Sequence, residues 1–557
     1  MSNLVSSSRG LVVSTDRHAS KAGIEALRAG GNAIDAAVAT AFTMAVSYPS
    51  CGNICGEGFM LFHGAEGTVH AFDFRAVAPK AAKIKMFLNE KGELKTSPFE
   101  GAISVGVPGT VLGMETAHMK LGSLPWHRLI EPAIRMAERG FKVDERLHNE
   151  MKACERTFRE HLSSGKVFLK ANGSFYETGE TFKQPDLAKT LGRIQRQGSH
   201  DFYHGETANL LVKFIRENGG ILTKEDLADY RVIERAPLKG SYRGYDVYTI
   251  GPPSSGAQLI EMLNILEGYD FKDIDTDSAE YLHLLTEVMR LSQRDRARYV
   301  GDPDFNPDLP LDRLISKDYA AELRERIPLD KAGISQVSDF LCNRESHETT
   351  HYSVVDGEGN SVSVTYTLNG DFGCEIVAEG TGMVLNNSMA DFNCVPGVTD
   401  DCGRIGTTPN LIEGGKRPRS SMIPTIFAKE GKPELVLGSP GGRTIPNVVL
   451  QIALKSVDYG INISEVVSSK RIHHGWMPDY TIIEEGAASQ ETLSKYRDMG
   501  HRVYDEKICR DLGLRYHPPS LGTAMCIQID WENHVFYGAA DTRSGDPSAF
   551  PVQTMKK

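Results

Sequence analysis

The sequence predicts an α+β fold in which helices pack over sheets. Two segments, 59–75 and 349–368, each read as strand, turn and strand, with turns rich in residues that tolerate positive φ. Residues 110–330 instead carry amphipathic stretches at helical spacing, separated by breaks such as Gly251-Pro-Pro-Ser-Ser-Gly256. Strands and helices mixed in this order along one chain are typical of stacked layers.

Two helices are expected near the N-terminus. The first runs from about His18 to Ala29, where Gly30-Gly31 stops it. Asn32 suits the N-cap of a second helix that extends to about Val46. Further helices are predicted at 126–139, 206–218, 256–268, 278–299, 445–458 and 464–470. Further strands are predicted at 424–429, 434–438, 501–504, 523–530 and 534–539.

The composition excludes several classes of function. Lys and Arg total 62 against 73 Asp and Glu, a formal net charge of -11, and no basic run is present to neutralise phosphates, so no nucleic-acid partner is expected. The nine cysteines contain no CxxC pair. Cys51 with Cys55, or Cys394 with Cys402, could form disulfides, but buried free thiols are the favoured interpretation. Adjacent His473 and His474 point in different directions on a helix or strand, so no metal and no cofactor are expected.

The N-terminal region carries no basic segment followed by an apolar core, which is the pattern of a secretory signal. A cytoplasmic location is therefore expected for the chain as written, and a periplasmic or secreted one if a signal has been removed. The stretch from Ala33 to Val46 is too short to span a bilayer, and Asp35 interrupts it. No membrane partner is expected.

The hairpin at 349–368 brings two threonines together. With its turn centred on Glu358, Thr349 and Thr367 lie equally far from the turn and face each other across the strands. Directly opposed residues share a face of the sheet, with Cβ atoms about 4.5–5.5 Å apart. Such a pair is commonly structural, and by itself it does not indicate catalysis.

A threonine hydroxyl is a weak nucleophile that needs an adjacent base. If Thr349 were the first residue of a chain, its own α-amine, with a reference pKa of about 7.7–8.0, would serve as that base. The hypothesis therefore requires cleavage between Glu348 and Thr349. Residues 329–348 are polar and turn-rich, and an exposed connection of this kind suits such a cleavage.

Two other segments carry groups that suit the same chemistry. Leu435 to Thr444 reads as a strand, a glycine turn and a helix start, so the N–H groups of Gly441 and Gly442 could stabilise an oxyanion. No lysine follows as in a phosphate-binding loop, and a simple tight turn remains the alternative. Ser420 and Ser421 could hydrogen-bond a carboxylate or fill a turn, and Arg75 could clamp a carboxylate or remain solvated.

Several of these motifs resemble bacterial γ-glutamyltranspeptidases, in order and over nearly the whole chain. The matching segments are Gly31-Asn-Ala-Ile-Asp-Ala-Ala37, Phe72-Asp-Phe-Arg75, Val107-Pro-Gly-Thr110, Gly301-Asp-Pro-Asp-Phe305, Thr349-Thr-His-Tyr-Ser-Val-Val-Asp356, Val364-Thr-Tyr-Thr-Leu-Asn369, Leu385-Asn-Asn387, Asp391-Phe392, Lys416-Arg-Pro-Arg-Ser-Ser421 and Gly438-Ser-Pro-Gly-Gly442.

The resemblance implies a role for each candidate residue. Thr349 matches the nucleophile, Thr367 its supporting hydroxyl, and Gly441 with Gly442 the oxyanion hole. The groups that hold the donor's α-carboxylate match Arg75, Ser420 and Ser421. The groups that hold its α-amino group match Asn369 and Asp391, with Ser388 beside them.

The resemblance also implies the fold and the reaction. We expect a four-layer αββα sandwich of N-terminal-nucleophile hydrolases, built from fragments 1–348 and 349–557 that stay together as a heterodimer. The expected substrate is a γ-glutamyl amide such as glutathione. Its glutamyl group would pass through an ester on the nucleophile to an amine acceptor or to water.

Three positions depart from the family pattern. Ser388 stands where Gln or Glu usually helps to bind the α-amino group, Cys402 where some members have a tyrosine over the pocket, and Glu57 lies within a glycine cluster. These changes leave open an acylase for glutaryl or other acyl amides. A catalytically silent homologue that acts as a binding protein is the alternative of a different class.

Overall fold

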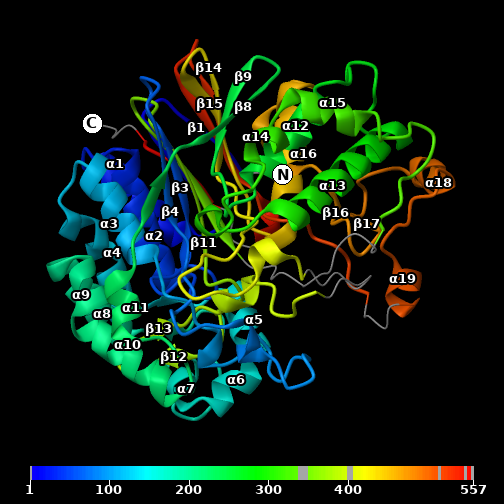
Figure 1. Ribbon diagram of the computed structural model, residues 1–557. Helices are drawn as coiled ribbons and strands as arrows, with labels where there is room; N and C mark the ends of the chain where they lie inside the picture. The colour runs from blue at the N-terminus through cyan, green and yellow to red at the C-terminus, as the bar shows by residue number, and fades with distance from the viewer. Residues whose placement is uncertain (1–2, 337–348, 398–405, 512–515, 545–547, 554–557) are drawn as a thin grey trace.

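Two seven-stranded sheets form the centre of the molecule (Figure 1). The computed structural model describes residues 3–336, 349–397, 406–511, 516–544 and 548–553. The first sheet has the order β1 (Asn3–Ser7), β19 (Val535–Ala540), β18 (Met525–Asp530), β15 (Lys432–Leu437), β14 (Thr425–Lys429), β9 (Tyr245–Thr249), β8 (Leu238–Tyr242). The second has the order β20 (Ser548–Pro551), β2 (Gly10–Ser14), β10 (Thr350–Asp356), β11 (Ser361–Thr367), β3 (Glu57–His63), β4 (Val69–Phe74), β7 (Ile233–Arg235).

Helices cover the outer face of each sheet. The second sheet is covered by α1 (Arg17–Arg28), α2 (Ala33–Ser47) and α3 (Thr110–Leu121), with α4 (Trp126–Arg139) packed on α2 (Figure 1). The first sheet is covered by α12 (Gly256–Leu266) and α17 (Ile463–Ser468), and α16 (Ile445–Val457) packs against both of these helices. Long α13 (Ala279–Tyr299) packs on α12. The layers are therefore helix, sheet, sheet, helix, as expected.

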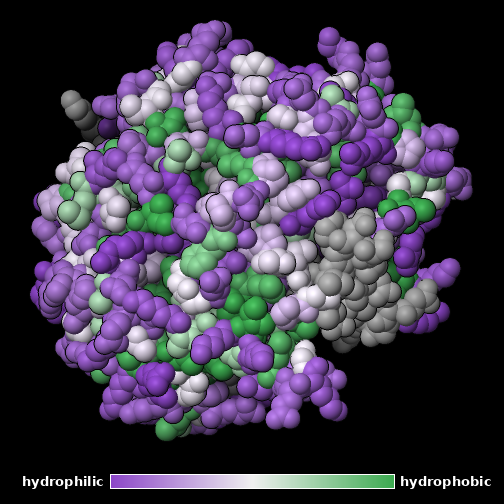
Figure 2. All heavy atoms as spheres, in the orientation of Figure 1, coloured by the Kyte–Doolittle hydropathy of each residue, from purple (hydrophilic) through white to green (hydrophobic). Residues whose placement is uncertain are grey.

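Alternation along the strands fills two cores. Val12 of β2 enters the core between the second sheet and its helices, whereas Leu11 and Val13 enter the core between the two sheets. Strands β10 and β11 are buried along their whole length because both of their faces are covered. On the face shown in Figure 2, hydrophilic residues predominate, with smaller hydrophobic patches between them.

Both sheets contain strands from both sides of Thr349. In the second sheet, β2 pairs with β10 and β11 pairs with β3. In the first, β1 pairs with β19 and β14 with β9. Fragments 1–348 and 349–557 would therefore share both sheets.

Most of the predicted elements are present. Asn32 caps α2, and a capping box with Asp35 completes the helix start. The strand predicted at 501–504 is wrong: only an isolated bridge between Val503 and Thr481 forms there. Within the two seven-stranded sheets, the sequence did not predict β1, β2, β7, β8, β9 and β20. No helix within the described ranges is both long and apolar enough to cross a membrane.

Candidate active site

The hairpin of β10 and β11 has the predicted register. Thr350 pairs with Tyr366 and His351 with Thr365. Thr349 directly precedes β10 and Thr367 ends β11, so the same register places Thr349 opposite Thr367. Both line one small cavity.

A polar seam joins this hairpin to the first sheet. His351 lies beside Thr365, with 2.9 Å between Nδ1 and Oγ1. Across the sheets, Ser353 Oγ donates to the Met525 carbonyl at 2.8 Å. Because strand residues alternate, Thr349 lies on the same face as His351 and Ser353, at the end of the seam.

Most of the predicted site residues surround the small cavity beside Thr349, which we call the inner cavity. Its volume is about 20 Å³, room for a single water in this uncut chain. An acyl group therefore enters only if the groups that fill the space now move apart. The lining residues are Arg75, Thr349, Thr367, Asn369, Asp391, Arg419, Ser420, Ser421, Met422, Gly442 and Ile445.

Arg75 is one of two buried arginines that line this cavity, the other being Arg419. Its guanidinium pairs with Glu57 Oε1 at 2.5 Å and, on the other side, with Asp391. Burial lowers the pKa of Arg75, but Glu57 and Asp391 raise it by more, so the group stays charged. Glu57 also accepts the Ala76 N–H at 2.6 Å. Sequence reasoning noted Glu57 only as a departure and did not predict this contact.

Ser420 and Ser421 lie on the connection into β14. The Ser420 carbonyl accepts the Ser255 hydroxyl at 2.6 Å, and Ser421 Oγ accepts from Arg296 Nη2 at 2.8 Å. Arg296 also donates to Ser255 Oγ at 2.6 Å, which links the two contacts. Neither Ser255 nor Arg296 was predicted, because each acts across the fold and follows no local motif.

Asn369 lies at a turn of the chain and lines the inner cavity. Its φ of 81° is in the left-handed region, which Asn tolerates better than most residues. Its N–H donates to Thr367 Oγ1 at 2.8 Å, and its Nδ2 donates to the Asn387 carbonyl at 3.0 Å. Ser388 is buried nearby but is not among the lining residues. Its hydroxyl has no hydrogen-bond partner among the described residues.

The glycine turn lies next to Thr349. Gly441 and Gly442 have φ values of 129° and 54°, a region that favours glycine. Gly442 lines the inner cavity and begins a short 3-10 turn, Gly442–Thr444, that leads into α16. The Gly441 carbonyl accepts the Thr444 hydroxyl at 2.8 Å. The N–H groups of such a turn suit a developing negative charge.

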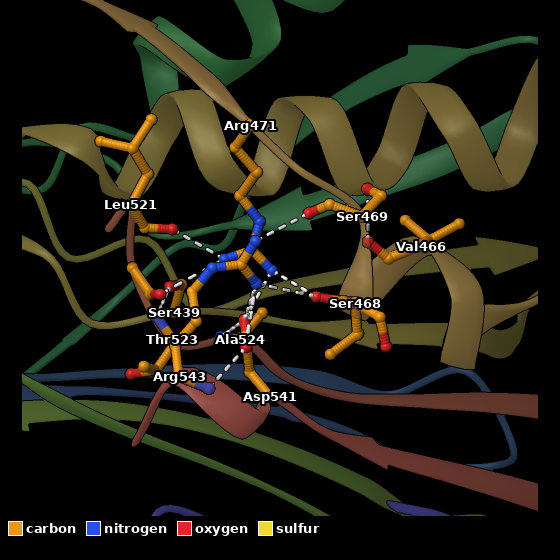
Figure 3. A network of polar contacts seen from close by, with 12 residues as sticks. Ser439, Val466, Ser468, Ser469, Arg471, Leu521, Thr523, Ala524, Asp541 and Arg543 are labelled. Atoms are coloured by element: carbon orange, nitrogen blue, oxygen red, sulfur yellow. Dashed lines mark hydrogen bonds and ion pairs between the residues drawn. The ribbon is translucent and has the colours of Figure 1, made fainter. Parts of the chain in front are cut away.

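A buried ionic network centred on Arg471 lies next to this turn (Figure 3). Arg471 donates to Asp541 Oδ2 and to the Leu521 carbonyl, both at 2.7 Å. Asp541 also accepts the Ala524 N–H at 3.2 Å. The segment 521–524 then contacts the turn directly, since the Thr523 N–H donates to Ser439 Oγ at 3.1 Å.

A second, larger cavity of about 630 Å³ opens beside the first, and we call it the outer cavity. Thr349 lines both cavities, and Gly441 lines the outer one. Among its other lining residues, Arg146 stacks over the Tyr48 ring at 3.9 Å. Thr349 thus lies at the boundary between a closed polar space and an open one.

A family model described as gamma-glutamyltranspeptidase matches residues 19–550. The chain belongs to the γ-glutamyltranspeptidase family. It is 40% identical to a glutathione hydrolase proenzyme of Escherichia coli (strain K12), over 97% of this chain and 92% of the relative. It is 35% identical to the acylase ACY 1 proenzyme of Pseudomonas sp. (strain SE83), over 89% and 88%.

Solved structures of this family share the fold. The cephalosporin acylase of Bacillus halodurans superposes with a TM-score of 0.87 at 27% identity, covering 99% of this chain and 97% of the acylase. The γ-glutamyltranspeptidase of Helicobacter pylori is 42% identical, with a TM-score of 0.56 over 57% of this chain and 91% of that one. These likenesses agree with the predicted αββα fold.

The remaining predictions concern thiols and metals. The seven cysteines in the described segments are all buried, and Cys51 and Cys55 are not bonded to each other. Cys342, Cys402 and Glu348 lie outside the described residues. His473 and His474 face different partners, Asn447 and Asp479. A group with metal-like spacing, His283, Glu287 and His501, has its two rings hydrogen-bonded to each other at 2.8 Å.

Proposed function

We propose that this chain is an autoprocessing γ-glutamyl transferase and hydrolase that acts on γ-glutamyl amides such as glutathione. The observation that carries the proposal is the Arg75–Asp391 ion pair inside the cavity that Thr349 lines. A γ-glutamyl donor presents an α-carboxylate and an α-ammonium. The carboxylate can take the place of Asp391 on Arg75 while the ammonium pairs with Asp391, so no buried charge is left uncompensated.

The chemistry follows from Thr349 at the boundary of the two cavities. The Thr349 hydroxyl attacks the γ-carbonyl, and its proton passes to the Thr349 α-amine as the O–C bond forms. The N–H groups of Gly441 and Gly442 stabilise the oxyanion. The α-ammonium returns the proton to the leaving amine as the C–N bond breaks. Water or an acceptor amine then attacks the ester from the outer cavity by the reverse sequence.

Self-cleavage between Glu348 and Thr349 is required, because the α-amine is otherwise part of a peptide bond. We infer that the fragments 1–348 and 349–557 remain together as a heterodimer. The shared sheets support this inference, since separating the fragments would break the β2–β10 and β3–β11 pairings. The backbone N–H and C=O groups along each separated strand would then lose their partners.

The second candidate is an acylase for glutaryl amides. The relationship to the acylases and the unpaired hydroxyl of Ser388 favour it. A glutaryl group has a carboxylate but no ammonium. Its carboxylate would displace Asp391 from Arg75, and the charge of Asp391 would then have no partner. An uncompensated buried carboxylate is costly, and this physical argument favours the γ-glutamyl donor.

Intact mass and substrate hydrolysis test the proposal together. We expect two fragments from the unsubstituted protein, a single uncut chain from Thr349→Ala, and both fragments from Thr349→Ser. We also expect release of p-nitroaniline from γ-glutamyl-p-nitroanilide faster than from the glutaryl compound. A faster glutaryl reaction would establish the acylase instead. An uncut, inactive protein would point to a silent homologue.

A further inference from the structure

Helix α13 carries a stripe of buried polar side chains, each three or four residues from the next, so that the stripe winds around the helix. They are His283, Glu287, Arg290, Gln293 and Arg296. The C-terminal end of the stripe reaches the inner cavity, where Arg296 contacts the lining residue Ser421. The N-terminal end contacts a different segment, Pro328–Ser335, which we call the tail segment because it leads toward Thr349.

Three residues of the stripe hold the tail segment. His283 Nε2 donates to the Pro328 carbonyl at 2.6 Å, and Glu287 Oε1 accepts the Gly333 N–H at 3.0 Å. Arg290 Nη1 donates to Ser335 Oγ at 2.8 Å.

Apolar burial does not hold the tail segment in place. Its two large apolar side chains, Leu329 and Ile334, are 68% and 78% exposed. Removing apolar side chains from water is a main source of stability in folded proteins, and here that contribution is mostly absent. The polar contacts with α13 therefore carry most of the attachment.

Asp479 connects this attachment to a second loop. It forms an ion pair with Arg290, and its Oδ2 accepts the Ser335 N–H at 3.1 Å. Its Oδ1 accepts from His474 Nε2 at 3.2 Å. His474 Nδ1 in turn accepts the Trp476 N–H at 3.1 Å, which fixes the tautomer that donates to Asp479.

The loop 474–479 contacts the glycine turn through Arg443, the residue after Gly442. Arg443 Nη2 donates to the carbonyls of Gly475 and Met477 at 2.9 and 3.1 Å. The stripe reaches the same residue, since Gln293 Nε2 donates to the Arg443 carbonyl at 3.3 Å. The contacts from Ser335 through Arg290 and Asp479 to Arg443 are thus continuous.

We propose that Arg290 and Asp479 form a positioning pair that couples the tail segment of the large fragment to the glycine turn Gly441–Gly442. The proposal rests on the proposed function, in which this turn stabilises the oxyanion. The stripe fixes both ends: the tail at Ser335 and the turn at Arg443. Breaking the pair frees the tail and lets the 474–479 loop shift against Arg443.

Arg290→Met tests the coupling, with Ile334→Ser as a matched control on the exposed side of the tail. Trypsin cleavage after Lys331 reports tail attachment, because the next N–H, of Ala332, donates to the Met499 carbonyl at 2.7 Å. We expect trypsin to cut Arg290→Met at least about tenfold faster, in proportion to the larger open population. We expect kcat to fall about ten- to hundredfold with KM within about twofold, since a small misplacement affects the transition state most.

Intact mass first confirms complete self-cleavage, so that kcat refers to mature enzyme. A normal kcat in a protein whose tail is cut faster would overturn the coupling, and an unchanged cutting rate would overturn the attachment. If Arg290→Met does not fold, Ser335→Ala and Asp479→Asn repeat both measurements with smaller perturbations. If the unsubstituted protein is inactive, the proposed function fails, whereas the trypsin comparison still tests the attachment.

Discussion

The imidazole of His351 occupies the space that a side chain on Gly438 would need. A Cβ placed on Gly438 would lie 2.0 Å from His351 Cε1. Gly438 follows β15 of the first sheet and His351 lies in β10 of the second, so their contact sets the spacing of the two sheets. Thr349 and the glycine turn lie at the same end of those two strands.

Gly438→Ala should therefore separate the sheets next to the nucleophile. Overpacking a filled core costs about 1–3 kcal/mol, and a contact this short cannot relax by side-chain motion alone. We expect a lower melting temperature and slower self-cleavage by intact mass. Gly251→Ala is the control, because its Cβ would meet only Leu238 Cβ at 3.9 Å. Equal melting temperatures for the two variants would contradict this account.

Thr367→Val should weaken donor binding. The Thr367 hydroxyl accepts the Asn369 N–H at 2.8 Å and so holds Asn369 at its positive φ. Valine leaves that buried N–H unpaired, at a cost of about 1–3 kcal/mol. We expect KM for γ-glutamyl-p-nitroanilide to rise about tenfold, and Thr367→Ser to retain near-normal KM. A normal KM for the valine variant would exclude this role of the hydroxyl.

The sequence was most informative where local rules decide the structure. The turn at Glu358 sets the β10–β11 register, and the register places Thr349 opposite Thr367 without any long-range contact. Glu57 and Arg296 were missed because their contacts join segments far apart in the chain. The strand predicted at 501–504 does not form, although Val503 is apolar. A strand needs a paired neighbouring strand, and Val503 forms only an isolated bridge with Thr481.

Glu57→Gln should reduce the preference for γ-glutamyl over glutaryl donors. Glu57 and Asp391 together place two carboxylates against Arg75, so the cavity disfavours a donor that brings only a negative charge. Removing one carboxylate should shift the ratio of the two kcat/KM values toward glutaryl by about tenfold, or about 1.4 kcal/mol. Glu57→Asp, which keeps the charge, is the control. An unchanged ratio would show that the charge of Glu57 does not determine selectivity.

The buried His351 should make the protein less stable as the pH falls. Burial lowers the pKa of His351 to about 3, from an ordinary value of 6.5 for histidine. Between these values the unfolded chain binds the proton and the folded chain does not, so the free energy of unfolding decreases as pH falls. The contribution is fully present above pH 6.5 and is lost progressively toward pH 3, at about 1.4 kcal/mol per pH unit.

From pH 7 to pH 5, His351 alone should therefore remove about 2 kcal/mol. Urea unfolding of the Thr349→Ala chain at the two pH values measures this loss without interference from self-cleavage. His351→Gln in the same background should show a loss smaller by that amount, because glutamine binds no proton. A substitution of exposed His534 should leave the loss unchanged. An equal loss with and without His351 would mean that other groups, such as His474, whose pKa burial lowers to about 4, dominate the acid response.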